Sequence, residues 1–420
     1  MPEAMKESGI EWVGKVPTLW TSKRAKYVFS NHKYIPGIQS YKYNRLALTL
    51  SGVIQRSKDD SDGLQPTDFN TYQLLCENEL VFKLIDLQNI STSRVGLAHT
   101  TGLVSPAYIV LQAKGEILPE FAEKYYLMMW YRRIFNALGD SGVRSSLNVS
   151  ELLELPIIIP PIEEQKRIAD FINEKCSEID SITNDIQSQI TTLEEYKKSV
   201  IIEAVTKGLD SNVEMKDSGI EWIGTIPKYW AVEKIKYHLQ RKEPRNPGNV
   251  QVLSVYREYG VIPKDSRDDN HNVTSEDTSK YKYVKPGNLV INKMKAWQGS
   301  LAISEYEGIV SPAYFIYHFI DDVFNKKYFH YLIRSCYKDE FRRISTGIRE
   351  GQWDLPSQDF ENELVLIPPK NEQDDIVNYL DSKCSEIDTI IQTKKEQLDV
   401  LAEYKKSLIY EYVTGKKEVK

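Results

Sequence analysis

The chain has 420 residues, 27% of them charged and 41% hydrophobic, with a formal net charge of −6. A chain of this length can form two to four domains with complete hydrophobic cores, so it does not require disulfides or a metal ion for stability. The acidic balance excludes a uniformly basic nucleic-acid-binding surface.

The first element in chain order is a short motif, Gly9-Ile10-Glu11-Trp12-Val13-Gly14, followed by Pro17 and Trp20. Residues 20–160 are then rich in Tyr, Ile, Val, Gly and Pro, with short alternating runs such as 79–85 between Gly or Asn turns. This pattern predicts a mixed α/β domain. One internal helix is expected at 119–138, with a counterpart at 326–344, where apolar residues recur at helical spacing beside several basic ones.

Residues 161–214 predict one long helix with a linker. The helix follows Pro160-Pro161, a pair that can begin a helix but cannot lie inside one. An apolar stripe with steps of three and four residues, typical of a coiled coil, runs through Ile168, Ile172, Cys176, Ile179, Ile182, Ile186, Ile190, Leu193, Tyr196, Val200 and Ala204. About 40 helical residues would extend about 60 Å.

The rest of the chain repeats these elements. The segment 5–14 recurs at 215–224, Val-Ser-Pro-Ala-Tyr 104–108 recurs at 310–314, the Pro-Pro and Glu-Gln pairs of 160–165 recur at 368–373, and Glu-Tyr-Lys-Lys-Ser 195–199 recurs at 403–407. A period of about 200 residues is too long for a solenoid repeat. We therefore predict a duplicated module with domains at 1–160 and 215–368 and long helices at 161–214 and 369–420.

The second helix has its own apolar stripe, through Ile376, Leu380, Cys384, Ile387, Ile390, Leu398, Leu401, Tyr404, Leu408 and Tyr412, with Lys394 where the first helix has Ile186. Two helices with one stripe each are expected to pair with each other in antiparallel orientation; the alternative is that each packs on its own domain. The predicted fold is α+β, with two mixed α/β domains separated by two long antiparallel coiled-coil helices and related by a pseudo-twofold axis.

Charge differs between these parts. Net charge is +3 for residues 1–150 and +3 for 215–360, but −8 for 151–214 and −4 for 361–420. The acidic surplus therefore lies in the segments that hold the predicted helices, and both domains remain compatible with DNA. Two similar domains about a twofold axis suit two inverted half-sites about one helical turn, or roughly 34 Å, apart. Because the domains diverge outside the shared motifs, we expect the helix pair to set the gap and the two half-sites to differ.

Several classes of chemistry lack their motifs. There is no phosphate-binding loop, no Gly-rich nucleotide fingerprint, no Asn-Pro-Pro-Tyr or Asp-Pro-Pro-Tyr tetrapeptide, and no His-Glu-x-x-His or Gly-x-Ser-x-Gly sequence. The four cysteines are far apart, which predicts reduced thiols and no zinc site. We expect no catalytic residue, bound metal or cofactor, and we interpret Glu-Tyr-Lys-Lys as a solvated helix face rather than a nuclease element.

The longest apolar run, Leu152 to Ile159, is interrupted by Pro156 and is too short for a bilayer, and the first residues lack a secretory signal pattern. These features predict a cytoplasmic protein with no membrane segment.

The shared motifs resemble those of the specificity subunits of type I restriction-modification systems, over essentially the whole chain. They are Gly-Ile-Glu-Trp with its following Pro and Trp, Gly142-Val143-Arg144 with Gly347-Ile348-Arg349, and Ile-Pro-Pro before each Glu-Gln pair. The resemblance implies a non-catalytic subunit that recognises an asymmetric bipartite site on double-stranded DNA. It also implies two methyltransferase subunits docked on the helices and, for cleavage, two restriction subunits. S-adenosylmethionine, ATP and Mg would be used by these partners.

Candidate DNA-contacting residues come from loops that mix basic, aromatic and amide side chains, since such groups contact phosphates and base edges. The first domain offers Tyr41, Tyr43, Arg45, Arg56, Lys58, Ser93 and Arg94. The second offers Arg241, Arg245, Lys293, Lys295 and Gln298. The loops at 91–94 and 292–298 precede similar sequences and form the preferred pair. Arg144 and Arg349 occur in both copies, so we assign them to phosphate contact or structure rather than to differing base preferences.

Two alternatives remain open at this point. The first is a recognition subunit of a related system in which nuclease and methyltransferase are fused in one partner chain. The second is a coiled-coil scaffold with two protein-binding domains, whose DNA affinity would lack a steep salt dependence.

Overall fold

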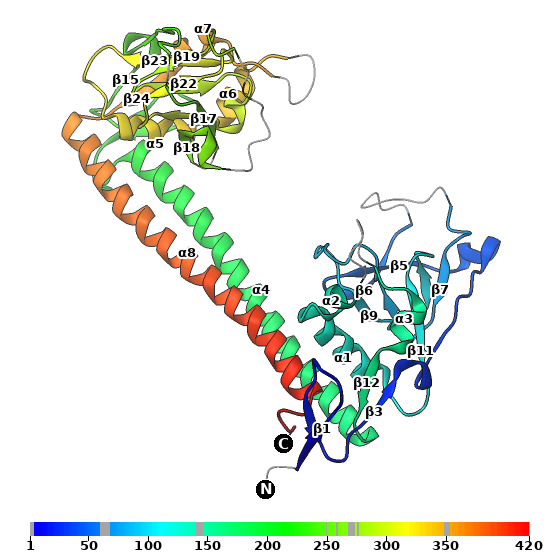
Figure 1. Cartoon of the computed structure of the whole chain (residues 1–420). Helices are drawn as coiled ribbons and strands as arrows, with labels where there is room; N and C mark the ends of the chain where they lie inside the picture. Colours follow the sequence, from blue (N-terminus) through cyan, green and yellow to red (C-terminus); the bar gives the residue numbers. More distant parts are fainter. Residues whose placement is uncertain are drawn as a thin grey trace. The chain divides into compact units, whose positions relative to one another are not determined.

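The computed structural model describes residues 4–58, 68–139, 146–248, 250–257, 259–267, 274, 277–347 and 353–419. The chain forms two compact units, one of residues 1–187 with 395–420 and one of 188–394. Figure 1 shows the elements of both units in sequence colours. Each unit contains one globular domain and part of each long helix, α4 (Ile162–Lys207) and α8 (Lys370–Val413).

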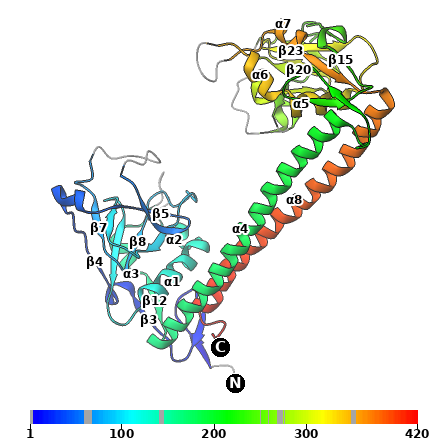
Figure 2. The same ribbon diagram turned by 180° about the vertical axis from the view of Figure 1, so that it is seen from behind.

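The first domain consists of short strands and helices. Its elements are β1 (Met5–Glu7), β2 (Lys15–Pro17), β3 (Thr21–Arg24), η1 (Ala25–Tyr27), β4 (Phe29–Asn31), η2 (Gly37–Lys42), β5 (Arg45–Thr49), β6 (Gly52–Arg56), β7 (Gln73–Leu75), β8 (Glu79–Phe82), β9 (Val95–Leu97), β10 (Gly102–Val104), β11 (Ile109–Ala113), α1 (Pro119–Tyr131), α2 (Ile134–Leu138), α3 (Val149–Glu154) and β12 (Pro156–Ile159). Two four-stranded sheets, in the orders β6-β5-β10-β7 and β4-β11-β8-β9, form its centre. The core includes Phe82, Phe121 and Tyr126, and α1 packs beside α4 (Figure 2).

The second domain follows the same plan. Its elements are β13 (Met215–Asp217), β14 (Thr225–Pro227), β15 (Ala231–Lys234), η3 (Ile235–Tyr237), β16 (Leu239–Arg241), β17 (Leu253–Tyr256), β18 (Gly260–Pro263), η4 (Lys264–Ser266), β19 (Lys282–Val284), β20 (Leu289–Asn292), η5 (Ala296–Gln298), β21 (Leu301–Ile303), β22 (Gly308–Val310), β23 (Tyr314–Phe319), α5 (Lys326–Cys336), α6 (Lys338–Ile344), α7 (Ser357–Asn362) and β24 (Leu364–Ile367). The sheet β16-β23-β20-β21 corresponds to β4-β11-β8-β9 of the first domain.

The internal helix predicted for each domain is interrupted in the structure. In the first domain, Arg133 separates α1 from α2 and adopts a left-handed conformation with φ of +57°. In the second, Tyr337 separates α5 from α6; its ring is buried, and its hydroxyl donates to the carbonyl oxygen of Leu364 at 2.6 Å. The expectation of one continuous helix was therefore wrong, because the backbone leaves the helical conformation at Arg133 and at Tyr337.

Each long helix begins directly after its Pro-Pro pair, as predicted, and a buried glutamine fixes its start. The Gln165 amide accepts from Leu118 N at 2.8 Å and donates to the carbonyl oxygens of Glu116 and Pro160. Gln373 makes the corresponding three hydrogen bonds to Asn325, Val323 and Pro368. The repeated glutamine thus joins the long helix to the N-terminus of the domain's internal helix.

The repeated Trp and Glu residues have an equally direct explanation. Trp20 Nε1 donates to Glu164 at 2.9 Å, and Trp230 Nε1 donates to Glu372 at 3.0 Å. Both indoles are buried, so these two residues act as packing anchors. The motifs that recur between the copies therefore hold each domain to the start of its long helix.

Helices α4 and α8 are antiparallel in both units, as predicted. Residues later in α4 contact residues earlier in α8. Phe171 packs on Tyr412 and Asp180 pairs with Lys405 in one unit, and Gln189 contacts Lys394 in the other. Figures 1 and 2 show the two helices side by side.

The predicted apolar stripe was wrong at four positions. Ile182, Ile390, Tyr196 and Tyr404 are exposed, and the tyrosines keep 48% and 54% of their accessible surface. A heptad phase of alternating three and four residues passes through Thr183, Ile391, Lys197 and Lys405 instead. The lysines can occupy this phase because their stems lie along the helix pair while their ammonium groups reach acidic partners.

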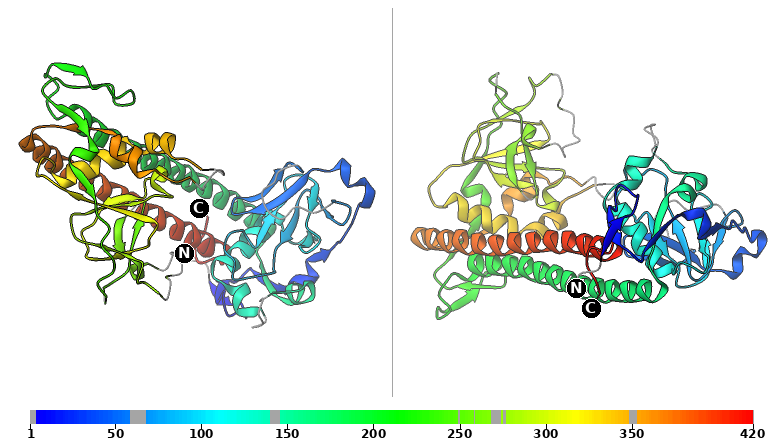
Figure 3. Two further views of the ribbon diagram at one scale, coloured as in Figure 1. Left: turned by 90° about the horizontal axis from the view of Figure 1, so that it is seen from above. Right: turned by 60° about the horizontal axis from the view of Figure 1, so that its bottom comes forward.

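The C-terminal end of each long helix completes the core of the other copy's domain. Leu408, Ile409 and Val413 of α8 lie in the first domain's core, and Val200, Ala204 and Val205 of α4 lie in the second's. After α8, Lys416 donates to the carbonyl oxygen of Lys15, so the two chain ends lie close together (Figure 3).

The structure has the predicted α+β fold class, with two mixed domains, antiparallel long helices and an internal duplication. The domain limits at 160, 214 and 368 remain sequence predictions. The four cysteines are free thiols. The described helices include none with the length and apolarity that a membrane span requires.

Candidate nucleic-acid interface

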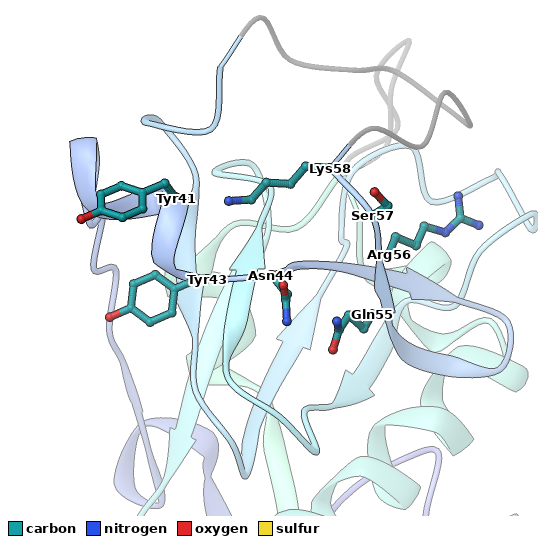
Figure 4. A pocket seen from close by; sticks show the side chains of 7 residues that line it. All are labelled: Tyr41, Tyr43, Asn44, Gln55, Arg56, Ser57 and Lys58. Atoms are coloured by element: carbon teal, nitrogen blue, oxygen red, sulfur yellow. The ribbon is translucent and has the colours of Figure 1, made fainter.

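A pocket of about 520 Å³ lies on the hairpin β5–β6 of the first domain. It is lined by Tyr41, Tyr43, Asn44, Gln55, Arg56, Ser57 and Lys58, which Figure 4 shows as sticks. Two loops that the sequence analysis treated separately, 41–45 and 56–58, therefore line one concave surface. Their meeting follows from the hairpin register, which pairs Arg45 with Arg56.

Positive charge is concentrated on this hairpin. Arg45 and Arg56 are direct cross-strand partners. The ammonium group of Lys58 donates to the carbonyl oxygen of Ser40 at 2.8 Å and lies 5.5 Å from the ring centre of Phe69. Arg45 is almost fully buried, whereas Tyr41 is exposed.

Ser93 and Arg94, in the connection between β8 and β9, are both buried. The Arg94 guanidinium donates to the carbonyl oxygens of Asp86, at 2.8 Å, and Asn89, and burial lowers its pKa. Ser93 Oγ donates to the carbonyl oxygen of Val95. These side chains hold the loop together, so contact between either of them and DNA would require the loop to open.

Arg241 and Arg245 lie at one side of the second domain. Arg241 donates to Glu243 at 2.6 Å and to Ser357 at 3.1 Å, and its guanidinium lies 4.3 Å from the ring centre of Phe315. The hydrogen bond to Glu243 raises the pKa of Arg241. Arg245 is exposed, with its backbone paired to Lys282. The guanidinium of Arg241 is thus already held by protein groups.

Lys293, Lys295 and Gln298 lie on the turn between β20 and β21, the connection that corresponds to 83–94 in the first domain. Lys293 pairs with Asp354 at 2.8 Å, and Lys295 is exposed. The Gln298 amide accepts a hydrogen bond from Arg257, which follows β17, so this turn is joined to the β17–β18 hairpin. The two loops preferred from the sequence, 91–94 and 292–298, occupy equivalent connections, but of these two only the second has an exposed basic group, Lys295.

Arg144 and Arg349 lie outside the described residues. Two residues of these surfaces, Gln55 and Arg257, were not among the candidates predicted from the sequence. Gln55 lines the pocket of the first domain, and Arg257 joins two surface elements of the second. The hairpin had a sequence signal, because the turn pair Ser51-Gly52 separates two short apolar runs, but nothing in the sequence singled out Gln55.

The geometry defines a duplicated recognition protein: two equivalent domains with different surface hairpins are connected by a shared helix pair. A family model for the type I restriction modification DNA specificity domain matches residues 64–192 and 234–400, and the chain belongs to this family.

Curated relatives agree with this assignment. The chain is 27% identical over 323 residues to a putative type I restriction enzyme specificity subunit, MjaX, of Methanocaldococcus jannaschii, covering 71% of this chain and 69% of the relative. It is 25% identical over 340 residues to the MjaVIII specificity subunit of the same organism, covering 76% and 75%.

Solved structures share the fold. A chain of a type I restriction-modification system studied for its assembly and conformational transition matches with a TM-score of 0.67 at 12% identity, covering 95% of this chain and 98% of that one. The HsdS subunit of Thermoanaerobacter tengcongensis matches with a TM-score of 0.51 at 14% identity, covering 96% and 98%. These findings support a DNA-specificity subunit of a type I system and do not favour the scaffold or fused-partner alternatives.

Proposed function

We propose that this chain directs a type I restriction-modification complex to an asymmetric, split DNA sequence, with each domain contacting one half. One observation carries the proposal. The Trp–Glu hydrogen bonds that hold each domain to its long helix recur in both copies, whereas the surface hairpins β5–β6 and β17–β18 differ in sequence. Repeated anchoring provides two equivalent positions for domains, and differing hairpins provide two base preferences.

The chemistry is assigned to partner chains. Two methyltransferase subunits dock on α4 and α8, and two restriction subunits join for cleavage. These partners use S-adenosylmethionine, ATP and Mg, while this chain binds DNA without catalysing a reaction. The complex acts in the cytoplasm, on the DNA it modifies. Membership of the specificity family supports this division of labour.

Genome-wide mapping of methylated bases, in source cells with and without this gene, tests the function. We expect adenine methylation at one asymmetric split motif to disappear when the gene is removed. If methylation is unchanged although the methyltransferase partner is expressed and active, the proposal fails.

A domain exchange separates the two halves. Replacing residues 20–150 with the corresponding domain of another specificity subunit should change one half-site and leave the other half and the spacer unaltered. Inserting seven residues into both α4 and α8 keeps the heptad phase and adds about 10 Å of helix. This insertion should alter only the spacer, and a change of bases would contradict a measuring role for the helices.

A further inference from the structure

The two surface hairpins are built on the same backbone frame. Leu103 N donates to the carbonyl oxygen of Asn44 at 2.8 Å, and Ile309 N donates to that of Gln251 at 2.9 Å. Gly102 and Gly308 sit beside these donors, and a Cβ on either would meet the Cγ of a buried leucine, Leu46 at 2.6 Å or Leu253 at 2.7 Å. The domains can therefore be compared residue by residue.

The registers of the two hairpins give the correspondence. Leu46 pairs with Gln55, and Leu253 pairs with Pro263, so Gln55 and Pro263 occupy the same position. Asn44 corresponds to Gln251, since each supplies the accepting carbonyl described above. Where the first hairpin carries two amide side chains, the second carries one amide and a proline.

The amides of the first hairpin are available for binding. Asn44 and Gln55 are exposed and line the same pocket (Figure 4), and neither amide forms a hydrogen bond with any other residue in the described part of the chain. The buried amide of Gln73, in contrast, donates to two backbone carbonyls. In the second domain, Gln251 donates to the carbonyl oxygen of Glu307 at 2.9 Å.

The position of the hairpin suits the major groove of DNA. β6 is the edge strand of its sheet, so β5 and β6 form a two-stranded ribbon with one open side. A two-stranded ribbon fits the major groove, where an Asn or Gln amide can accept a hydrogen bond from adenine N6 through its oxygen and donate one to adenine N7 through its nitrogen. Arg56 and Lys58 lie beside the amides, where cations contact phosphates.

We propose that Asn44 and Gln55 form an adenine-reading pair, which recognises an A·T base pair of the half-site bound by the first domain and has no equivalent in the second. The inference rests on the proposed function. The A·T pair is distinct from the one that is methylated, because a base must leave the stack to reach a methyltransferase active site.

The test uses the full chain with its partner subunits in the source cell. Gln55→Ala, Asn44→Ala and Gln55→Glu are introduced at the gene, and methylated sites are mapped genome-wide for each. We expect each alanine variant to reduce the preference for adenine at one position of one half-site by about 10- to 100-fold, the range for a bidentate contact. Gln55→Glu should shift that position towards cytosine, whose amino group a carboxylate accepts.

Matched variants control for structure. Gln55→Pro introduces the residue that the second hairpin has at this register, so the strand geometry accommodates it, and it should act like Gln55→Ala. Gln251→Ala should leave the first half-site unchanged. Thermal unfolding of the purified variants should match that of the unaltered chain, because Asn44 and Gln55 are exposed.

The outcomes separate this inference from the function on which it rests. Suppose that the unaltered chain directs methylation to a split motif. If the Gln55 and Asn44 variants then change the base preference at no position, or weaken it at a G·C pair or in the other half-site, the adenine-reading pair is wrong and the proposed function stands. If no split motif depends on the gene, both proposals are overturned.

Discussion

The ammonium group of Lys197 on α4 lies 2.6 Å from the carboxylate of Asp388 on α8. Its duplicated counterpart, Lys405 on α8, lies 2.6 Å from Asp180 on α4. The repeated Glu-Tyr-Lys-Lys segment is therefore part of the contact between the helices, because its first lysine pairs with an aspartate of the facing helix.

Breaking one of these ion pairs should have a small effect. Asp388→Ala should lower the free energy of unfolding by less than about 1 kcal/mol, because both partners are partly solvated. Lys197→Asp and Asp388→Lys, made singly, each place two like charges opposite each other, and combining them should restore most of the stability that each loses. Unfolding of these two single variants and of the double variant, at low and high salt, measures the coupling between the two positions. A loss of several kcal/mol in Asp388→Ala would contradict this description.

The buried glutamines should matter far more. Gln165→Ala leaves Leu118 N and two backbone carbonyls without their partner, so we expect a loss of about 2–3 kcal/mol. Asn184→Ala, on the exposed face of the same helix, is the control and should be close to neutral. Chemical denaturation of both variants provides the comparison, and equal stabilities would show that the glutamine does not anchor the helix.

Substitutions at two glycines should distinguish the energetic cost of a strained backbone from the cost of a packing clash. Gly208 and Gly219 both have φ of +75°, but a Cβ at Gly208 would meet Glu372 Oε1 at 2.6 Å, whereas a Cβ at Gly219 would meet nothing within 4 Å. Gly219→Ala should cost about 1–2 kcal/mol from the left-handed conformation alone. Gly208→Ala should cost more, since Glu372 also holds Trp230. The difference between their unfolding free energies isolates the packing contribution.

Glu363 should make stability depend on pH. Burial, together with Glu340 and Asp359, raises its pKa to about 7, although Arg343 opposes the shift. The folded chain thus retains a proton that the unfolded chain releases near pH 4.5, so this residue's contribution falls as pH rises from about 4.5 to 7. Glu363→Gln should be stabilising at pH 8 by less than about 1 kcal/mol, given solvent screening, and neutral near pH 4.

Melting temperatures measured between pH 4 and 8 test this dependence. The exposed Glu305→Gln controls for the loss of one negative charge. A stabilisation by Glu363→Gln that is the same at every pH would contradict the assigned titration.

The sequence predicted the features that depend on spacing. Pro160-Pro161 marked the start of α4, and recurring Trp and Glu residues identified the duplication before their hydrogen bonds were known. The apolar stripe was placed one residue away from its true phase at Tyr196, because tyrosine is apolar enough to fit the pattern while lysine has a stem long enough to replace it.

The candidate site was harder to predict because composition does not distinguish an exposed cation from a buried one. Arg94 lies in a loop of Ser and Thr that resembles a phosphate-binding segment, yet its guanidinium is turned inward to backbone carbonyls. Gln55 has no unusual sequence context, and its interest arises only from the cross-strand register that places it with Asn44 in one pocket. The roles of the candidate residues in DNA binding remain predictions.

The exchange of helix ends between the copies sets an order of events during synthesis on the ribosome. The second domain's core takes Val200, Ala204 and Val205 from a segment that has already been made, so it can close soon after Ile376 and Leu380 emerge. The first domain must wait for Leu408, Ile409 and Val413, which are among the last residues translated. The domain made first is therefore the one completed last, and a chain that stops before residue 408 would leave its apolar surface open to chaperones and proteases.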